Sequence, residues 1–203
     1  MIVAVDGPAA AGKGTIARGL ARHFGYHFLD TGALYRMVGL AVIRAGQDPA
    51  DAAAAIAAAN SLDPARFADG DLRSEAVGAA ASIVAVVPEV RSALLSLQRG
   101  FAQKPPGAVL DGRDIGTVVC PDADVKLYVT ASPEVRAARR QKELGAASYA
   151  DVLAEIRARD LRDSQRATAP LLPARDAVIL DTSELDIAAA TAKAISIADR
   201  ARG

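Results

Sequence analysis

The segment DGPAAAGKGT, residues 6–15, has residue types that suit the binding of phosphate. Its spacing is G-x-x-x-x-G-K, ending at Lys13. Glycine allows the backbone to curl so that successive N–H groups point at phosphate oxygens, and the lysine adds a full positive charge. The common pattern continues with Ser or Thr to hold Mg²⁺, whereas this chain has Gly14 there and a hydroxyl only at Thr15. The segment predicts a nucleoside triphosphate site.

Other interpretations of this loop fit its surroundings less well. A flexible surface turn would not explain the apolar run Ile2–Val5 before the loop, or the apolar residues at i, i+4 and i+8 from Ile16 after it. A dinucleotide-binding loop would carry a third glycine where this chain has Ala17. The ending G-K-G-T resembles nucleoside monophosphate kinases rather than GTPases.

A second polar segment, DTGALYR at residues 30–36, follows another short apolar run. It offers a hydroxyl at Thr31, an aromatic ring at Tyr35 and a guanidinium at Arg36. A helix cap at Thr31 and a solvated Arg36 are equally consistent with these residue types. From the residues alone, the segment is either a ligand site or an ordinary helix start.

A third segment, DGRDIGT at residues 111–117, follows the apolar run at 108–110. Asp111 stands where phosphate-loop enzymes carry the carboxylate that organises Mg²⁺. The two glycines suggest close approach of the backbone to a ligand. Arg113 lies beside two carboxylates and could form a plain ion pair, but its position after a strand favours contact with a nucleotide.

A fourth candidate is the basic run at residues 157–166, RARDLRDSQR. The spacing of Arg159, Arg162, Asp163 and Arg166 puts these residues on one face of a helix. Such runs are usually solvated, salt-bridged faces. Phosphoryl transfer offers a different explanation, because arginine forks bind phosphate oxygens at two points and neutralise developing charge.

Further cations precede this run. An earlier predicted helix carries Arg136, Arg139 and Arg140, which add to the positive charge available to a phosphoryl group. Gly145 then offers a hinge for a short lid over residues 141–166. Closure of such a lid would exclude water, which otherwise competes with the acceptor for the phosphoryl group.

Short apolar runs separated by helical patterns surround these segments, as expected for a parallel sheet wrapped by helices. Ligands of such sheets bind beyond the carboxyl ends of the strands, where the first three polar segments fall. An alanine-rich stretch opens the segment 48–87, which breaks the alternation and indicates an insertion. The predicted strands are residues 2–6, 27–30, 108–111, 124–129 and 177–181.

Several local patterns predict helix boundaries. Ser132 precedes Pro133, a capping hydroxyl before a first-turn proline. Ser148 and Ser183 each precede an aspartate by three residues, which predicts two capping boxes. Pro88 opens a helix with an expected apolar stripe of Val90, Leu94, Leu97 and Phe101.

Composition limits the classes of protein to consider. The 203 residues include 24 Lys and Arg against 24 Asp and Glu, so bulk charge does not indicate a nucleic-acid or membrane partner. The start of the chain does not resemble a signal peptide, and no apolar run has the length of a membrane span. Cys120 is expected in the core, and His23 and His27 lack metal-ligand spacing. We expect a cytoplasmic monomer.

Together the motifs resemble bacterial cytidylate kinase, over nearly the whole chain and in the same order. An adenylate kinase would carry a D-G-F-P-R type segment in place of DGRDIG, and a GTPase would carry an N-K-x-D base reader. The matching segments are DGPAAAGKGT at 6–15, LDTGALYR at 29–36, LDGRDIGTVV at 110–119 and EIRARDLRDSQRATAPLLPA at 155–174.

The resemblance implies a single α/β kinase domain over residues 1–203, with the five-stranded parallel sheet of phosphate-loop NTPases flanked by helices. Its core would comprise 1–31, 88–140 and 167–203, with a small nucleoside monophosphate-binding insertion at 32–87 and a short lid at 141–166. The implied reaction is direct in-line transfer of the γ-phosphoryl group of ATP to CMP or dCMP, with Mg²⁺, giving CDP or dCDP and ADP.

The resemblance also assigns roles to individual residues. Thr15 and Asp111 would hold Mg²⁺, directly or through water, and the candidate catalytic cations are Lys13, Arg139, Arg159 and Arg166. ATP would contact Gly7, Pro8, Ala9, Ala10, Ala11, Gly12, Lys13, Gly14 and Thr15. CMP would contact Thr31, Tyr35, Arg36, Ser82, Arg91, Arg113, Asp114, Arg159, Asp163 and Arg166.

One departure from the family concerns the insertion, which is usually longer and carries a β-hairpin where this chain has only residues 68–70. Thr31 also stands where many members have Ser, which keeps the hydroxyl. The shortening leaves open the choice between CMP, dCMP and UMP as acceptor. The alternatives are a kinase of the same fold with another small acceptor and a non-enzymatic module that senses ATP.

Overall fold

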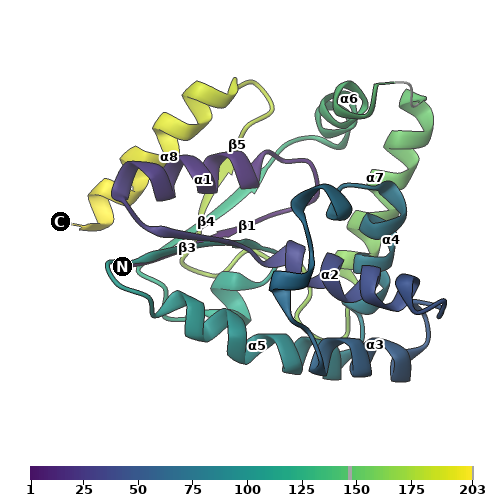
Figure 1. The fold of residues 1–203 in the computed structure, drawn as a ribbon. Coiled ribbons are helices and arrows are strands. Elements are labelled where there is room, and N and C mark those ends of the chain that lie inside the picture. The colour runs from purple at the N-terminus through teal and green to yellow at the C-terminus, as the bar shows by residue number, and fades with distance from the viewer. Residues whose placement is uncertain (146–147, 203) are drawn as a thin grey trace. The chain divides into compact units, whose positions relative to one another are not determined.

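Five strands form one sheet in the computed structural model, which describes residues 1–145 and 148–202. The strand order is β2-β3-β1-β4-β5, and β1 lies parallel to β3 and β4, as β4 does to β5 (Figure 1). The predicted five-stranded parallel sheet is confirmed. The strands are β1 Ile2–Asp6, β2 His27–Asp30, β3 Ala108–Gly112, β4 Val125–Thr130 and β5 Val178–Asp181.

The central strands β1 and β3 are largely buried apolar runs because helices cover the sheet, whereas β4 alternates between buried and partly buried residues. Every residue of β3 is buried. Figure 1 shows α1, Lys13–Phe24, and α8, Ile187–Arg202, side by side on one face of the sheet. Ile16 and Leu20 of α1 pack with Val3 and Val5 of β1 in the main hydrophobic cluster. This packing fixes the start of α1 at the carboxyl end of β1.

Two compact units make up the chain: Met1–Leu29 with Phe101–Gly203, and Asp30–Gly100. The first unit holds the core of the sheet together with α1, α8, α6 Pro133–Leu144, α7 Tyr149–Ser164 and the π-helical turn η3 Ile115–Val119. Residues 146–147, inside the expected lid, lie outside the described residues.

The second unit is helical. Leu34 and Val38 pack with Ala55, Val90 and Leu94 in its main hydrophobic cluster. Val90 and Leu94 of α5 are thus buried within this unit, while the division of the chain into kinase core, insertion and lid stays a prediction from the sequence. The helices of this unit are α2 Thr31–Arg44, α3 Ala52–Asn60, α4 Glu75–Val84 and most of α5 Pro88–Ala102, with the 3₁₀ turns η1 Pro64–Arg66 and η2 Asp69–Leu72.

The helix starts confirm some capping predictions and correct others. The Ser132 hydroxyl accepts the amide hydrogen of Val135, as predicted. Ser148 precedes α7 but makes no capping bond through its side chain. The predicted cap at Ser183 is wrong. The carboxylate of Asp186 caps α8 by accepting the amide hydrogen of Ala189, while the Ser183 hydroxyl donates to Asp181.

Two further points concern α2, where the sequence left open a cap at Thr31, and α5, where an expectation needs correction. Asp30, rather than Thr31, caps α2 by accepting the amide of Ala33. The predicted apolar stripe of α5 is only partly buried, because Leu97 is exposed. Among the described residues, no single helix is long and apolar enough to cross a membrane, although α4 and α5 pass that test as a pair bent by 101°.

Candidate functional site

The phosphate-type loop connects β1 to α1 in a backbone shape that its glycines permit. Gly7 has φ +145°, and a Cβ atom there would lie 1.9 Å from the carbonyl oxygen of Val129. Gly12 has φ +87° and begins α1 without a side-chain cap. Ala10 adopts φ +58°, a conformation that L-residues rarely adopt. The loop is therefore held in a specific curl ahead of a helix N-terminus, the arrangement that binds anions.

Lys13 lies inside this curl. Its Nζ donates to the carbonyl oxygen of Pro8 at 2.8 Å and lies 4.0 Å from Oδ1 of Asp111. Burial, reinforced by the charge of Arg113, lowers the pKa of Lys13, while Asp111 opposes this. The structure thus brings together the predicted cation and the predicted metal-organising carboxylate.

The Asp111 carboxylate lies close to the backbone of Gly14. A Cβ atom at Gly14 would stand 3.1 Å from Oδ2 of Asp111, tighter than an ordinary contact. The carboxylate thus occupies space beside the position where the common motif has a hydroxyl-bearing side chain. Thr15 supplies its hydroxyl one residue later, at an exposed position of the first turn of α1.

Asp6, which the sequence did not single out, connects the end of β1 to the DGRDIGT segment. Its Oδ1 accepts the amide of Ile115 at 2.8 Å and its Oδ2 that of Gly116 at 2.7 Å. The side chain thus caps η3 from 109 residues away in the sequence. Burial raises the pKa of Asp6 to about 7, although both hydrogen bonds act in the opposite direction.

This raised pKa predicts a pH-dependent stability. Between about pH 4 and pH 7 the folded chain holds a proton at Asp6 that the unfolded chain has released, so the free energy of unfolding falls as pH rises. The contribution amounts to about 4 kcal/mol at most. Urea unfolding across this range should show the decline, and Asp6→Asn should flatten it. A slope unchanged by Asp6→Asn would contradict the assignment.

Asp163 is the centre of an arginine cluster. Its side chain is 1% exposed and accepts hydrogen bonds from Nε of Arg113, at 3.0 Å, and from Nη2 of Arg166. Burial alone would raise the pKa of Asp163, but Arg113, Arg166 and Arg159 outweigh it and hold the pKa below its usual value. One buried carboxylate therefore binds two of the predicted arginines, Arg113 after β3 and Arg166 after α7, and lies within the electrostatic influence of a third, Arg159 of α7.

Two other predicted cations have structural partners. Arg139 donates to the hydroxyl and carbonyl oxygens of Thr182, at 3.0 and 2.6 Å, and to the carbonyl of Leu185. Its catalytic role stays a prediction. Arg140 pairs with Glu143 at an exposed position of the same helix.

Five of the predicted acceptor residues belong to the second unit. Thr31 and Ser82 are buried there, and Arg36 pairs with Asp30 at 2.6 Å. The guanidinium of Arg91 lies 5.6 Å from the centroid of the Tyr35 ring, and it donates to the carbonyl of Ala85. Asp114, the remaining predicted residue, is buried in the first unit and precedes η3.

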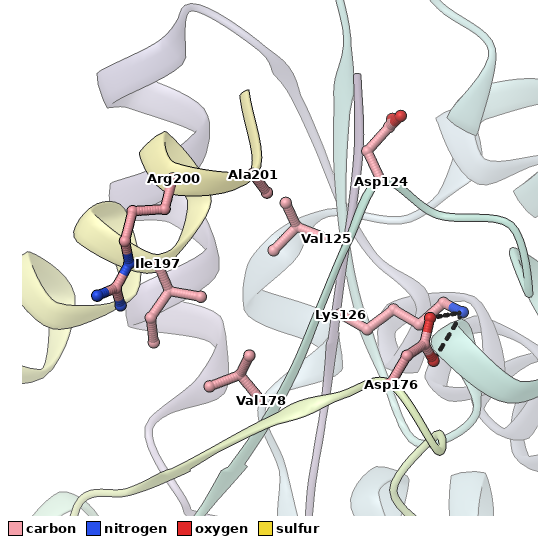
Figure 2. A pocket seen from close by; sticks show the side chains of 8 residues that line it. All are labelled: Asp124, Val125, Lys126, Asp176, Val178, Ile197, Arg200 and Ala201. Carbon is pink, nitrogen blue, oxygen red and sulfur yellow. Dashed lines mark hydrogen bonds and ion pairs between the residues drawn. The ribbon is translucent and has the colours of Figure 1, made fainter. Parts of the chain in front are cut away.

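A hollow of about 410 Å³ lies away from the loop (Figure 2). The hollow is formed at the amino-terminal ends of β4 and β5, whereas the loop follows the carboxyl end of β1. Because these strands are parallel, the hollow and the loop lie at opposite ends of the strands. In Figure 2 Lys126 points at Asp176, with which it pairs at 2.7 Å. Within the described residues, no group of three or more His, Cys, Asp and Glu has the geometry of a metal site.

Comparison with known proteins adds independent findings. The family model described as "Cytidylate kinase" matches residues 3–200. The chain is 58% identical to the cytidylate kinase of Azorhizobium caulinodans, with full coverage of both chains. It is 59% identical to that of Paramagnetospirillum magneticum, covering 97% of this chain and 96% of the relative.

Solved structures support the fold alone. A gluconokinase from Sinorhizobium meliloti is similar with a TM-score of 0.54 at 15% identity, covering 98% of this chain and 93% of that one. An uncharacterized protein from Eubacterium ventriosum has a TM-score of 0.58 at 13% identity, covering 98% of both chains.

Proposed function

The chain belongs to the cytidylate kinase family, and on this premise we propose that it transfers the γ-phosphoryl group of ATP to CMP or dCMP. The observation that carries the proposal is the pairing, within one unit, of a curled phosphate-type loop with the arginine cluster around Asp163. A loop for the donor phosphates and several cations for the transferring group are what phosphoryl transfer requires.

The loop, residues 7–15, would hold the ATP phosphates through its backbone N–H groups and the N-terminus of α1. Lys13 would exchange its bond to Pro8 for phosphate oxygens, whose negative charge restores the charged form of its ammonium. Arg159 and Arg166 would neutralise charge on the transferring group. The attacking oxygen belongs to the acceptor phosphate and is already ionised, so the reaction requires no protein nucleophile or strong base.

Mg²⁺ fits the donor set beside the loop, because carboxylate and hydroxyl oxygens are ligands that it prefers. Asp111, with a largely buried side chain, and Thr15 would hold the ion, directly or through water, together with phosphate oxygens. When bound, Mg²⁺ would neutralise charge on the donor phosphates.

The second unit would supply much of the acceptor site. Cytosine presents an amino donor beside carbonyl and ring-nitrogen acceptors, so hydroxyl and guanidinium partners suit its edge. Ser82 and Arg91 provide these groups, and Arg36 and Thr31 would hold the nucleotide. We retain the sequence boundaries of the functional parts, with the acceptor-binding insertion at 32–87 and the lid at 141–166. A cytoplasmic monomer without nucleic-acid or membrane partners stays a prediction from the sequence.

A panel of acceptors tests the proposed reaction. With ATP and Mg²⁺, a coupled assay for ADP should show rapid turnover with CMP and dCMP and much slower turnover with AMP. The shortened insertion makes UMP the informative fourth acceptor. Turnover with UMP or AMP but not CMP would indicate another acceptor class, and ATP binding without acceptor-dependent ADP would indicate a sensing module.

Arg113→Ala tests the acceptor-binding part of the proposal. Loss of a charged hydrogen-bond partner is worth about 1.5–3 kcal/mol, which corresponds to a KM for CMP raised about 10- to 100-fold. The KM for ATP should change little. Arg140→Ala, which removes an exposed arginine paired with Glu143, is the matched control. An unchanged KM for CMP in Arg113→Ala would refute the assignment.

A further inference from the structure

Arg136 is one of the most enclosed charged residues of the described chain, with 4% of its side chain exposed. Its guanidinium joins three segments. Nη1 and Nη2 donate to the two carboxylate oxygens of Asp160 on α7, at 3.0 and 2.6 Å. Nε donates to the carbonyl oxygen of Ala131 after β4, and Nη1 also donates to that of Ala9 in the phosphate loop, at 3.2 Å.

The sequence counted Arg136 among cations available to phosphate, but these four bonds commit four of its five N–H donors to protein atoms. A bidentate arginine–carboxylate pair fixes direction as well as distance, because two parallel bonds resist rotation. Asp160 directly follows Arg159 and lies three residues before Asp163. The pair therefore sets the register of the segment of α7 that carries Arg159 and Asp163.

A second contact joins the loop to the same helices. Ala10, the loop residue with φ +58°, packs against a small hydrophobic cluster of Ala137, Val152 and Ile156 from α6 and α7. The loop thus touches α6 and α7 through an apolar contact at Ala10 and through the hydrogen bond of Ala9 to Arg136. Both contacts involve the part of the loop that turns beside Lys13.

We infer that Arg136 and Asp160 are positioning residues that hold Arg159 and Asp163 of α7, at the centre of the arginine cluster, in register with the phosphate loop. Neither acts on phosphate itself. Slippage of α7 by one residue would rotate its side chains by about 100° and shift them by about 1.5 Å. Misplacement of about 1 Å is enough to lower a rate about 100-fold. The consequence for CMP phosphorylation rests on the proposed function.

The chain provides a matched control for this inference. Arg157 and Glu134 also join α7 to α6, at 2.8 Å, but both side chains are more than half exposed. Arg157→Ala removes a pair between the same two helices that does not involve the loop. Exposed pairs of this kind contribute little to stability.

The test compares Asp160→Asn, Arg136→Ala, the double variant and Arg157→Ala in the full chain. We expect Arg136→Ala to lower kcat about 100-fold with KM values for ATP and CMP within about threefold. The double variant should be no slower than Arg136→Ala, because the two residues act as a unit. Arg157→Ala should keep the wild-type kcat. The inference would be overturned if the fold loss of kcat in the double variant equalled the product of the losses in the two single variants. Raised KM values with an unchanged kcat would also overturn it.

Hydrogen exchange gives a readout that does not depend on the acceptor. Asp160→Asn, the milder change, should speed amide exchange in residues 7–12 and in α7 at least tenfold more than Arg157→Ala does. Equal exchange in the two variants would overturn the positioning role, whatever the wild type phosphorylates. A wild type that does not use CMP would refute the proposed function alone, since the exchange comparison still decides the inference.

Discussion

Lys13→Ala should lower kcat for CMP phosphorylation by about a thousandfold, the scale expected for loss of one charged group that acts mainly in the transition state. The side-chain nitrogen is buried inside the curl of the loop, where the phosphates would bind, so only its bond to Pro8 has to be exchanged when phosphate arrives. The KM for CMP should change less than about threefold, because the change lies on the donor side. Steady-state and single-turnover rates with saturating ATP and CMP measure the effect.

Lys126→Ala is the matched control for this result. The Lys126 side chain is also largely buried and pairs with Asp176 at 2.7 Å. It lines the hollow at the amino-terminal ends of β4 and β5, whereas the loop follows the carboxyl end of β1. Its loss should leave kcat near the wild-type value. Normal turnover by Lys13→Ala would show that the loop assignment is wrong, and an equal loss in Lys126→Ala would show that the effect is not specific to the loop.

Asp163→Asn should have the second largest effect, on both stability and activity. The substitution removes the charge that compensates Arg113 and Arg166 at a 1% exposed position, and breaking a buried pair in this way costs about 3–5 kcal/mol. We expect kcat/KM for CMP to fall at least about 100-fold, because both arginines lose the carboxylate that orients them. Urea unfolding at neutral pH and initial rates with varied CMP measure the two effects.

Acid provides an independent check on Asp163. Because its folded pKa lies below the unfolded value, the carboxylate contributes stability at pH values above about 3.8, and this contribution is lost as the pH falls through the folded pKa. The free energy of unfolding of Asp163→Asn should therefore depend less on pH in this acid range than that of the wild type. Asp176→Asn is the comparison: it removes an exposed carboxylate whose pKa the hydrogen bond from Lys126 also lowers, and it should weaken the pH dependence much less than Asp163→Asn. Wild-type stability in Asp163→Asn would contradict the central role of this carboxylate.

The sequence predicted the sheet nearly residue by residue, because each strand is a short, mainly apolar run with clear ends, even in β2 and β5, which are mostly not buried. Its prediction that Arg159, Arg162, Asp163 and Arg166 share one helix face is only partly right, because α7 ends at Ser164, before Arg166, and leaves Arg162 exposed beside the buried Asp163. Burial on that face was not predictable, because it depends on Arg113, which lies 50 residues from Asp163.

The contacts that the sequence missed join residues far apart in the chain. Asp6 caps a turn 109 residues away, and Arg136 reaches the loop across 127 residues. Neither residue lies in a pattern that distinguishes it from an ordinary strand end or a helical cation. The failed capping box at Ser183 has a local cause, since Asp181 accepts the Ser183 hydroxyl and the helix begins later.

Gly14 and Asp111 have a consequence for how the loop can change over generations. Because a Cβ atom at position 14 would crowd the Asp111 carboxylate, the effect of any substitution at one position depends on the residue at the other. Serine at position 14, favourable in the common motif, would here displace that carboxylate by a few tenths of an ångström. The two positions are therefore coupled: a side chain at position 14 should be tolerated best where the Asp111 carboxylate and the Arg18 guanidinium can move aside.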